Sequence, residues 1–228
     1  MSIEVKVCGL TTADAVAATA EGGARYFGFV FYPPSPRSLE PKQARALAAK
    51  VPSHGLKVAV LVDPSDAQLA SILREVPLDL LQLHGAETPE RVAAIQAGTG
   101  RRVIKALKIA EESDLASVGA YAQLADMLLF DAKPPREPGR LPGGNGLSFD
   151  WRLLERLDLE RPWLLSGGLS AANLADAVRL CRARAVDVST GVERRPGLKD
   201  PAKVRRFLEL AAVLEPPPPA SQPTRQSA

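Results

Sequence analysis

The chain has 228 residues, of which 46% are hydrophobic and only 5% aromatic, and its formal net charge is +3. A chain of this length forms one large α/β domain or two small ones. The mildly basic balance comes without a long Lys/Arg run interleaved with aromatic residues, which argues against nucleic-acid binding. No apolar run is long enough to cross a bilayer, and the N-terminus lacks the basic and apolar regions of a signal peptide.

Only two cysteines are present, and they stand far apart in the sequence. Such a pair forms neither a disulfide framework nor a zinc site. We therefore expect a cytoplasmic protein with free thiols, no bound metal and no membrane partner.

Short β-branched runs alternate with Ala/Leu-rich stretches along most of the chain. The predicted strands are Ile3–Cys8, Tyr26–Phe31, Lys57–Val62, Leu80–His84, Arg102–Leu107, Met127–Asp131, Trp163–Ser166 and Ala185–Ser189. The predicted helices span residues 13–21, 41–50, 65–76, 89–97, 111–125, 151–157, 171–182 and 201–214. These pairs predict an α/β fold, a single (β/α)₈ TIM barrel over residues 1–214.

A doubly wound open sheet is the structural alternative. No G-x-G-x-x-G pattern follows the first predicted strand, which counts against a dinucleotide site there. The Pro-rich segment at residues 215–228 has nothing to bury, and we expect it to be a disordered tail.

Polar residues stand where the predicted strands end, which is where a barrel of this kind gathers its reactive groups. Along the first strand, Lys6 and Cys8 share the face that points into the barrel, with Lys6 one layer below. A buried ammonium favours a thiolate, so we expect a lowered pKa for Cys8 and a role as base. A small core hydrophobe is the common alternative for a free cysteine, and it suits Cys181 within a helical run.

Asp131 ends the apolar strand Met127–Asp131. An aspartate at this place is often a turn-former or a helix cap, but no helix is predicted directly after it. A carboxylate at a barrel mouth with apolar neighbours is a candidate general acid.

Two glycine-containing turns predict a phosphate site. The first contains Gly167 and Gly168, and the second contains Ser189 and Gly191. Glycines let backbone N–H groups approach an anion, and phosphate sites of barrels often follow the seventh and eighth strands.

Arg37 and His84 each allow two interpretations. Arg37 follows a stiff proline-rich loop, and it either grips a carboxylate or is a solvated surface arginine. His84 either orients a substrate or forms a hydrogen bond to a loop.

Taken together, these motifs resemble the phosphoribosylanthranilate isomerase family, in family order and over nearly the whole chain except the tail. The matching segments are residues 6–11 (KVCGLT), 28–31 (GFVF), 35–37 (SPR), 81–85 (LQLHG), 128–131 (LLFD), 149–151 (FDW), 166–169 (SGGL) and 187–193 (DVSTGVE). Within the segment Lys133–Leu147, which we expect to form a lid, Asn145 stands where the family usually has threonine.

The resemblance implies an Amadori rearrangement of N-(5-phosphoribosyl)anthranilate, without a metal or an organic cofactor. Asp131 would be the general acid, the thiolate of Cys8 the general base, and Arg37 the group that holds the anthranilate carboxylate. The residues expected to bind the phosphate are Gly167, Gly168, Ser189 and Gly191. Those expected to contact the rest of the substrate, besides Arg37, are Lys6, Gln82, His84 and Asp187, the last because it shares the inward face of its strand with Ser189. The expected partner is a phosphorylated small molecule, and the expected assembly is a monomer.

Other functions on the same fold remain open at this point. An aldolase would need a buried lysine at a strand end, for which Lys108 is the candidate. A histidine-pathway relative would normally have an aspartate in place of Cys8. A non-catalytic phosphate binder would not need both Cys8 and Asp131.

Overall fold

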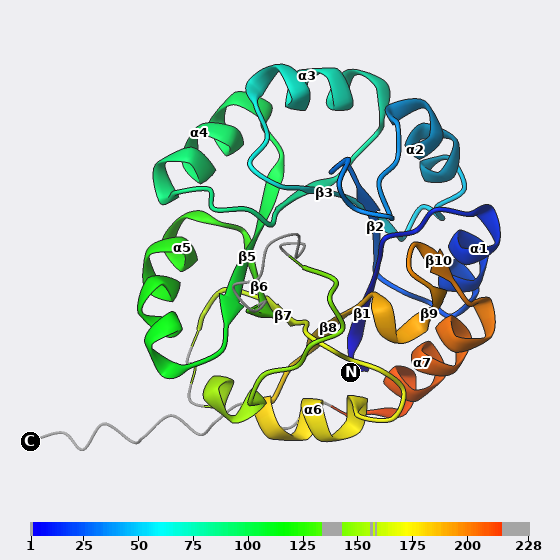
Figure 1. Cartoon of the computed structure of the whole chain (residues 1–228), viewed down its shortest axis with the longest axis vertical. Helices are drawn as coiled ribbons and strands as arrows, with labels where there is room; N and C mark the ends of the chain where they lie inside the picture. The colour runs from blue at the N-terminus through cyan, green and yellow to red at the C-terminus, as the bar shows by residue number, and fades with distance from the viewer. Residues whose placement is uncertain (1, 134–142, 156, 158, 216–228) are drawn as a thin grey trace, which may run out of the picture.

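Eight parallel strands close into a barrel in the computed structural model, which describes residues 2–133, 143–155, 157 and 159–215 (Figure 1). The strands follow one another in chain order, and β8 pairs with β1 to close the ring. Their bounds are β1 Glu4–Cys8, β2 Tyr26–Val30, β3 Leu56–Leu61, β4 Leu80–Leu83, β5 Arg102–Ile109, β6 Met127–Ala132, β7 Trp163–Leu165 and β8 Ala185–Val188. The predicted barrel is confirmed, and the open sheet is excluded.

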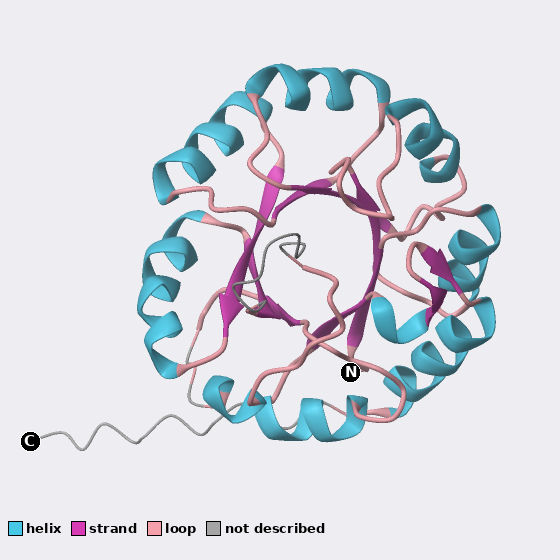
Figure 2. Cartoon of the chain, viewed as in Figure 1, coloured by secondary structure: helices cyan, strands magenta, loops and turns pink. Residues whose placement is uncertain are grey.

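Helices surround this ring (Figure 2). Their bounds are α1 Ala13–Glu21, α2 Pro41–Ala48, α3 Asp66–Glu75, α4 Pro89–Thr99, α5 Val118–Leu124, α6 Leu174–Cys181 and α7 Pro201–Val213, with the 3₁₀-helices η1 Glu112–Ser117, η2 Trp151–Leu154 and η3 Thr190–Val192. Local sequence determines where several of these helices begin. Ser65, for example, accepts a hydrogen bond from the backbone N–H of Gln68 and caps α3.

Several predicted elements differ in the structure, and the helix predicted at 151–157 is the short 3₁₀-helix η2. The helix predicted at 111–125 is divided into η1 and α5, and the helix predicted from residue 171 begins only at Leu174. A hairpin of β9 (Glu193–Arg195) and β10 (Leu198–Lys199) stands where a loop was predicted, and Figure 2 shows it outside the barrel ring. Pro196 and Gly197 link its strands, and Gly197 has a φ of 82°, so this Pro-Gly pair was the missed turn signal.

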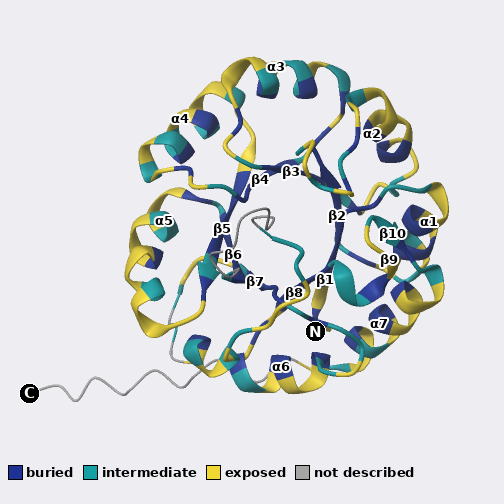
Figure 3. Cartoon of the chain, in the orientation of Figure 1, coloured by how far each residue is buried: buried dark blue, intermediate teal, exposed yellow. Residues whose placement is uncertain are grey.

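Two apolar layers hold the fold together. One lies between the strands and the helices, and the other fills the barrel below its mouth with residues such as Tyr26, Leu80, Ile104 and Leu129. Figure 3 shows buried strands and helices whose outer faces are exposed. Because the lower barrel is filled, the room for a ligand inside the described barrel lies at its mouth, where the strands end.

Some predictions fall outside the described residues. They concern residues 134–142 of the expected lid and residues 216–228 of the expected tail. In the described part of the chain, no helix has the length and apolar character needed to span a membrane.

Candidate active site

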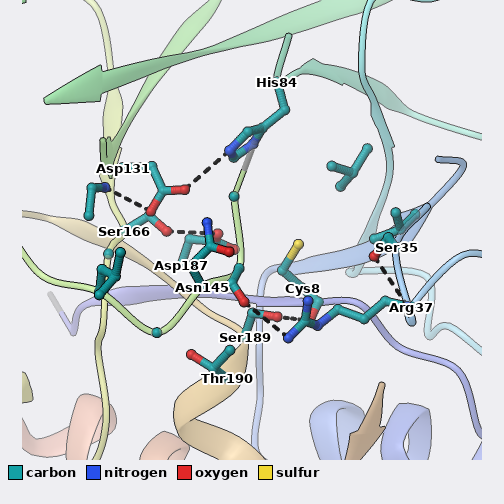
Figure 4. A pocket seen from close by; sticks show the side chains of 18 of the residues that line it. Cys8, Ser35, Arg37, His84, Asp131, Asn145, Ser166, Asp187, Ser189 and Thr190 are labelled. Atoms are coloured by element: carbon teal, nitrogen blue, oxygen red, sulfur yellow. Dashed lines mark hydrogen bonds and ion pairs between the residues drawn. The ribbon is translucent and has the colours of Figure 1, made fainter. Parts of the chain in front are cut away.

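A pocket opens at the C-terminal ends of the strands, and the space within its lining, open mouth included, is about 790 Å³ (Figure 4). The predicted site residues that line it are Cys8, Arg37, His84, Asp131, Gly167, Gly168, Asp187 and Ser189. Lys6 and Gln82 are fully buried beneath this lining, and Gly191 follows the lining residue Thr190. The fold thus gathers the predicted residues at one mouth.

Cys8 lies at the end of β1, directly above a buried ion pair. The Nζ of Lys6 is 2.8 Å from the Oδ1 of Asp187, its register neighbour on β8. Gly28 of β2 is the register partner of Cys8, and a Cβ added there would lie 3.3 Å from both the thiol sulfur and the ammonium nitrogen. The missing side chain of Gly28 therefore leaves the space in which Lys6 approaches Cys8.

The predicted lowered pKa of Cys8 is wrong. Burial raises the pKa of the thiol above its usual value; Lys6 and Lys199 lower it by less, and Asp187 adds to the rise. Burial also lowers the pKa of Lys6, but Asp187 and Cys8 together raise it above its usual value. Lys6 therefore stays charged, but the negative charge of Asp187 offsets much of its effect on the pKa of Cys8.

Asp131 is held by a chain of buried polar groups. Its Oδ2 lies 3.1 Å from His84 Nε2, and its Oδ1 accepts a hydrogen bond from the backbone N–H of Ala132 at 3.0 Å. The Nδ1 of His84 lies 2.7 Å from the side-chain nitrogen of Gln82. His84 therefore contacts the proposed acid, and Gln82 orients His84 from below.

The backbone of Gly143 passes close to this pair. A Cβ at residue 143 would lie 2.3 Å from His84 Nε2 and 2.9 Å from Asp131 Oδ2. Gly144 has a φ of 71° and lies against Arg37 in the same way. Gly143 therefore lets the loop approach Asp131 and His84, and Gly144 lets it approach Arg37, more closely than a residue with a side chain would.

The two glycine-containing turns that were predicted to bind phosphate line the pocket. Gly167 and Gly168 have φ values of 90° and 66°, which L-residues rarely adopt. Within the described residues, no acceptor takes up the backbone N–H groups of Gly168, Thr190 and Gly191. Free N–H groups beside the first turn of η3 suit an anion such as phosphate.

The hydroxyl of Ser189 already has hydrogen-bond partners within the protein. It donates to the carbonyl oxygen of Cys8 at 3.1 Å and accepts from the ammonium of Lys199 at 3.1 Å. Ser189 therefore contributes to the site mainly by fixing the β8 turn against β1.

Arg37 reaches the pocket but is not free. Its Nε and Nη2 donate to the two carboxylate oxygens of Glu193 at 2.8 and 2.9 Å, and Nη2 also lies 3.3 Å from the carbonyl oxygen of Gly144. Burial alone would raise the pKa of Glu193, but Arg37 and Lys199 hold it below its usual value. The interpretation of Arg37 as a solvated surface residue is wrong.

Glu193 and Lys199 were missed as site residues. Both come from the unpredicted hairpin. Glu193 ends the family segment at residues 187–193, but its partner Arg37 is distant in sequence, and Lys199 meets Ser189 and Glu193 only when the hairpin forms. Lys108, the candidate aldolase lysine, is the register partner of Asp131 and is half-buried, and burial lowers its pKa. Its side chain does not belong to the pocket lining, which argues against an aldolase.

Residues 5–210 match the model of a family described as N-(5'phosphoribosyl)anthranilate (PRA) isomerase. The chain belongs to this family. An N-(5'-phosphoribosyl)anthranilate isomerase of Rhodospirillum centenum is 56% identical over 94% of this chain and all of its own length. The enzyme of the same name from Paracoccus denitrificans is 54% identical over 93% of this chain and 99% of its own length.

Solved structures of the same family have the same fold. Phosphoribosyl anthranilate isomerase from Thermotoga maritima superposes with a TM-score of 0.83 at 35% identity, covering 93% of this chain and all of the other. A complex of such an isomerase with reduced 1-(o-carboxyphenylamino)-1-deoxyribulose 5-phosphate gives a TM-score of 0.79 at 32% identity with the same coverage. The protein is therefore an isomerase of tryptophan biosynthesis, and the isomerase activity that the resemblance implied is confirmed. A monomeric state and a cytoplasmic location stay predictions.

Proposed function

We propose that the protein converts N-(5-phosphoribosyl)anthranilate to 1-(2-carboxyphenylamino)-1-deoxyribulose 5-phosphate, with Asp131 as general acid and Cys8 as general base. The observation that carries this proposal is the placement of a thiol and a carboxyl group in one pocket. They come from the ends of β1 and β6, beside a cluster of free backbone N–H groups. An acid and a base at separate points of one cavity suit a reaction that both donates and removes a proton.

The acid step opens the sugar ring. Asp131 would protonate the ring oxygen of the ribose, and the C1–O bond would break to give an iminium between C1 and the anthranilate nitrogen. His84 and the N–H of Ala132 contact the two oxygens of this carboxyl group, which fixes its direction. Orientation of this kind is what general acid catalysis requires.

The base step moves the double bond. The thiolate of Cys8 would remove the proton from C2, and the C–H electrons would pass to the iminium nitrogen to give an enolamine. The enolamine then gains a proton at C1 and loses one from the C2 hydroxyl, which leaves the ketone. The iminium accepts the electrons, so the chemistry balances without a further cofactor.

The raised pKa of Cys8 constrains this step. The thiolate is the minor form at neutral pH. The positive charges of Lys6 and Lys199 increase its fraction, because they lower the pKa of Cys8 against the effect of burial. A positive iminium next to the sulfur would favour the thiolate further, at the moment when the base is needed.

Substrate binding would use the two ends of the pocket. Arg37 would hold the anthranilate carboxylate, and the N–H groups of Gly168, Thr190 and Gly191 would hold the phosphate. On the same proposal residues 1–214 form the whole catalytic domain, since the last described helix of the barrel, α7, ends at Val213.

The test replaces the acid. Asp131→Asn keeps the shape and the hydrogen-bonding capacity but lacks an acidic proton, so product formation should fall by at least about a thousandfold. Product would be trapped by borohydride reduction and measured by chromatography. Asp176→Asn, at a side chain that is 71% exposed, is the matched control and should match the wild type. Near-normal turnover in Asp131→Asn would reject the proposed acid.

A further inference from the structure

The β9–β10 hairpin lies behind Arg37 and contributes two buried charged residues to it. Glu193 binds the Nε and Nη2 side of the guanidinium with both carboxylate oxygens, at 2.8 and 2.9 Å. The exposed fractions are only 5% for Arg37, 8% for Glu193 and 2% for Lys199. A bidentate pair at this depth fixes the plane of the guanidinium as well as its position.

Lys199 fixes Glu193 in turn. Its ammonium lies 2.9 Å from Glu193 Oε1 and 3.1 Å from both the carbonyl and the hydroxyl oxygen of Ser189. Three acceptors match its three donors, so its bonding capacity is filled. The network therefore joins the Arg37 end of the pocket to the β8 turn at the phosphate end.

The backbone of the hairpin is packed against the loop that carries Arg37. A Cβ at Gly197 would lie 2.3 Å from the carbonyl oxygen of Pro36, and the carbonyl oxygen of Gly197 accepts a hydrogen bond from the Thr11 hydroxyl at 2.7 Å. The stem of Arg37 passes over Gly9, where a Cβ would lie 2.5 Å from Arg37 Cδ. Both ends of the arginine are thus held.

This arrangement leaves one part of the guanidinium for a ligand. Within the described residues, no acceptor contacts Nη1, which lies 2.7 Å from where a Cβ of Gly144 would stand, and both Arg37 and Gly144 line the pocket. The network contains two cations and one anion, so it carries one uncompensated positive charge. An uncompensated buried cation favours an anionic ligand.

We infer that Glu193, supported by Lys199, is a positioning residue that makes the pocket selective for a substrate with a carboxylate, by turning the Nη1 end of Arg37 toward it. The inference rests on the proposed function for the identity of that carboxylate. Glu193 touches no part of the substrate and acts only through Arg37.

The test separates the carboxylate from the rest of the ligand. Calorimetric titration would compare reduced 1-(o-carboxyphenylamino)-1-deoxyribulose 5-phosphate with the same compound lacking the carboxyl group. For the wild type we expect the carboxylate to improve Kd by at least about tenfold. Glu193→Gln should remove most of this preference and leave the Kd of the carboxyl-free ligand within about twofold of the wild-type value.

Kinetics and a matched variant complete the test. In Glu193→Gln, KM for phosphoribosylanthranilate should rise about tenfold with kcat within about threefold, because the reacting groups are untouched. Arg195→Gln, at an exposed position of the same hairpin, should match the wild type in both measurements. If Glu193→Gln does not fold, Glu193→Asp keeps the charge but draws it away from Arg37, and it should show the same selective loss.

An equal loss of affinity for both ligands would overturn the inference, since it would show a general structural role. No loss for either ligand would overturn it as well. Failure of the wild type to turn over phosphoribosylanthranilate would instead reject the proposed function, because the binding comparison needs no turnover.

Discussion

His84 Nε2 lies 3.1 Å from Asp131 Oδ2, and both side chains are more than nine-tenths buried. The histidine is therefore a partner of the proposed acid. Its other ring nitrogen faces Gln82, so the tautomer of His84 and the direction of the Asp131 carboxyl group are coupled. Gln82 and His84, which were predicted to bind substrate, therefore orient the carboxyl group of Asp131.

Replacing this histidine should slow the chemical step. His84→Asn should lower kcat by up to about a hundredfold and leave KM within about threefold, because the acid loses its orientation while the binding groups remain. Steady-state kinetics measure this split. His54→Asn, in the other histidine of the chain, is the control and should be silent. A rise in KM at constant kcat would show instead that His84 binds substrate.

The raised pKa of Cys8 predicts an alkaline pH dependence. A base works in its deprotonated form, and each pH unit below its pKa leaves about ten times less thiolate. Because burial raises this pKa above the usual thiol value, the residual kcat/KM of Asp131→Asn, in which the acid no longer titrates, should climb steadily from neutral pH toward pH 9. A profile that is flat over this range would contradict the assignment of Cys8 as the base.

Thiol alkylation provides an independent test of the role of Cys8. Cys8 lines the pocket, whereas Cys181 is buried in α6, where burial raises its pKa to about 11. Iodoacetamide should therefore modify Cys8 first, at a rate that increases with pH, and activity should disappear in step with this modification. Loss of activity that follows Cys181 instead would be inconsistent with the site.

Gly191 tests the phosphate turn. A Cβ at this position would lie 2.0 Å from the carbonyl oxygen of Leu169, so the two turns of the proposed phosphate site would have to separate. Gly191→Ala should raise KM at least about tenfold and destabilise the fold by roughly 1–3 kcal/mol, as overpacking usually does. Gly119→Ala, at a helical site where an added Cβ has open space, is the control. Thermal melts and kinetics would show whether the two variants differ.

A buried ion pair away from the pocket predicts the acid sensitivity of the fold. Lys105 Nζ lies 2.6 Å from Glu87 Oε2, and both side chains are almost fully buried. Burial would raise the pKa of Glu87, but Lys105 and several N–H donors lower it below its usual value. The stability that this shift contributes is present above the unfolded pKa of ~4.3 and is lost as the pH falls through the folded pKa.

Glu87→Gln would expose the contribution of this pair. Removing one partner leaves an unpaired buried ammonium, so the free energy of unfolding should fall by about 3 kcal/mol at neutral pH. The variant should also lose part of the acid sensitivity of the wild type. Denaturant titrations at pH 7 and pH 4 measure both, and an unchanged midpoint at pH 7 would show that the pair contributes little.

Much of the fold and of the candidate site could be predicted from local sequence patterns. The alternation along β1 placed Lys6 and Cys8 on the inward face, and the strand ends placed Asp131 at the mouth, because both features depend only on neighbouring residues. The missed hairpin also had a local signal, the turn at Pro196 and Gly197.

Other features depend on the packed molecule. The pKa of Cys8 follows from how far it is buried and from how Asp187 neutralises Lys6, and neither is visible in the first strand. The pairing of Arg37 with Glu193 joins residues from opposite ends of the chain. Only the closed barrel brings them together, so sequence reasoning identified the arginine but not the group that orients it.

The central claim is that Cys8 is the base of an isomerase that acts on phosphoribosylanthranilate. The most direct test follows the fluorescence decay of freshly formed phosphoribosylanthranilate with the wild type and with Cys8→Ala side by side. The account predicts fast decay with the wild type and only the uncatalysed rate with the variant, whose thermal melt stays close to that of the wild type. Equal decay with both proteins would contradict the role of Cys8, and no decay with the wild type would contradict the substrate.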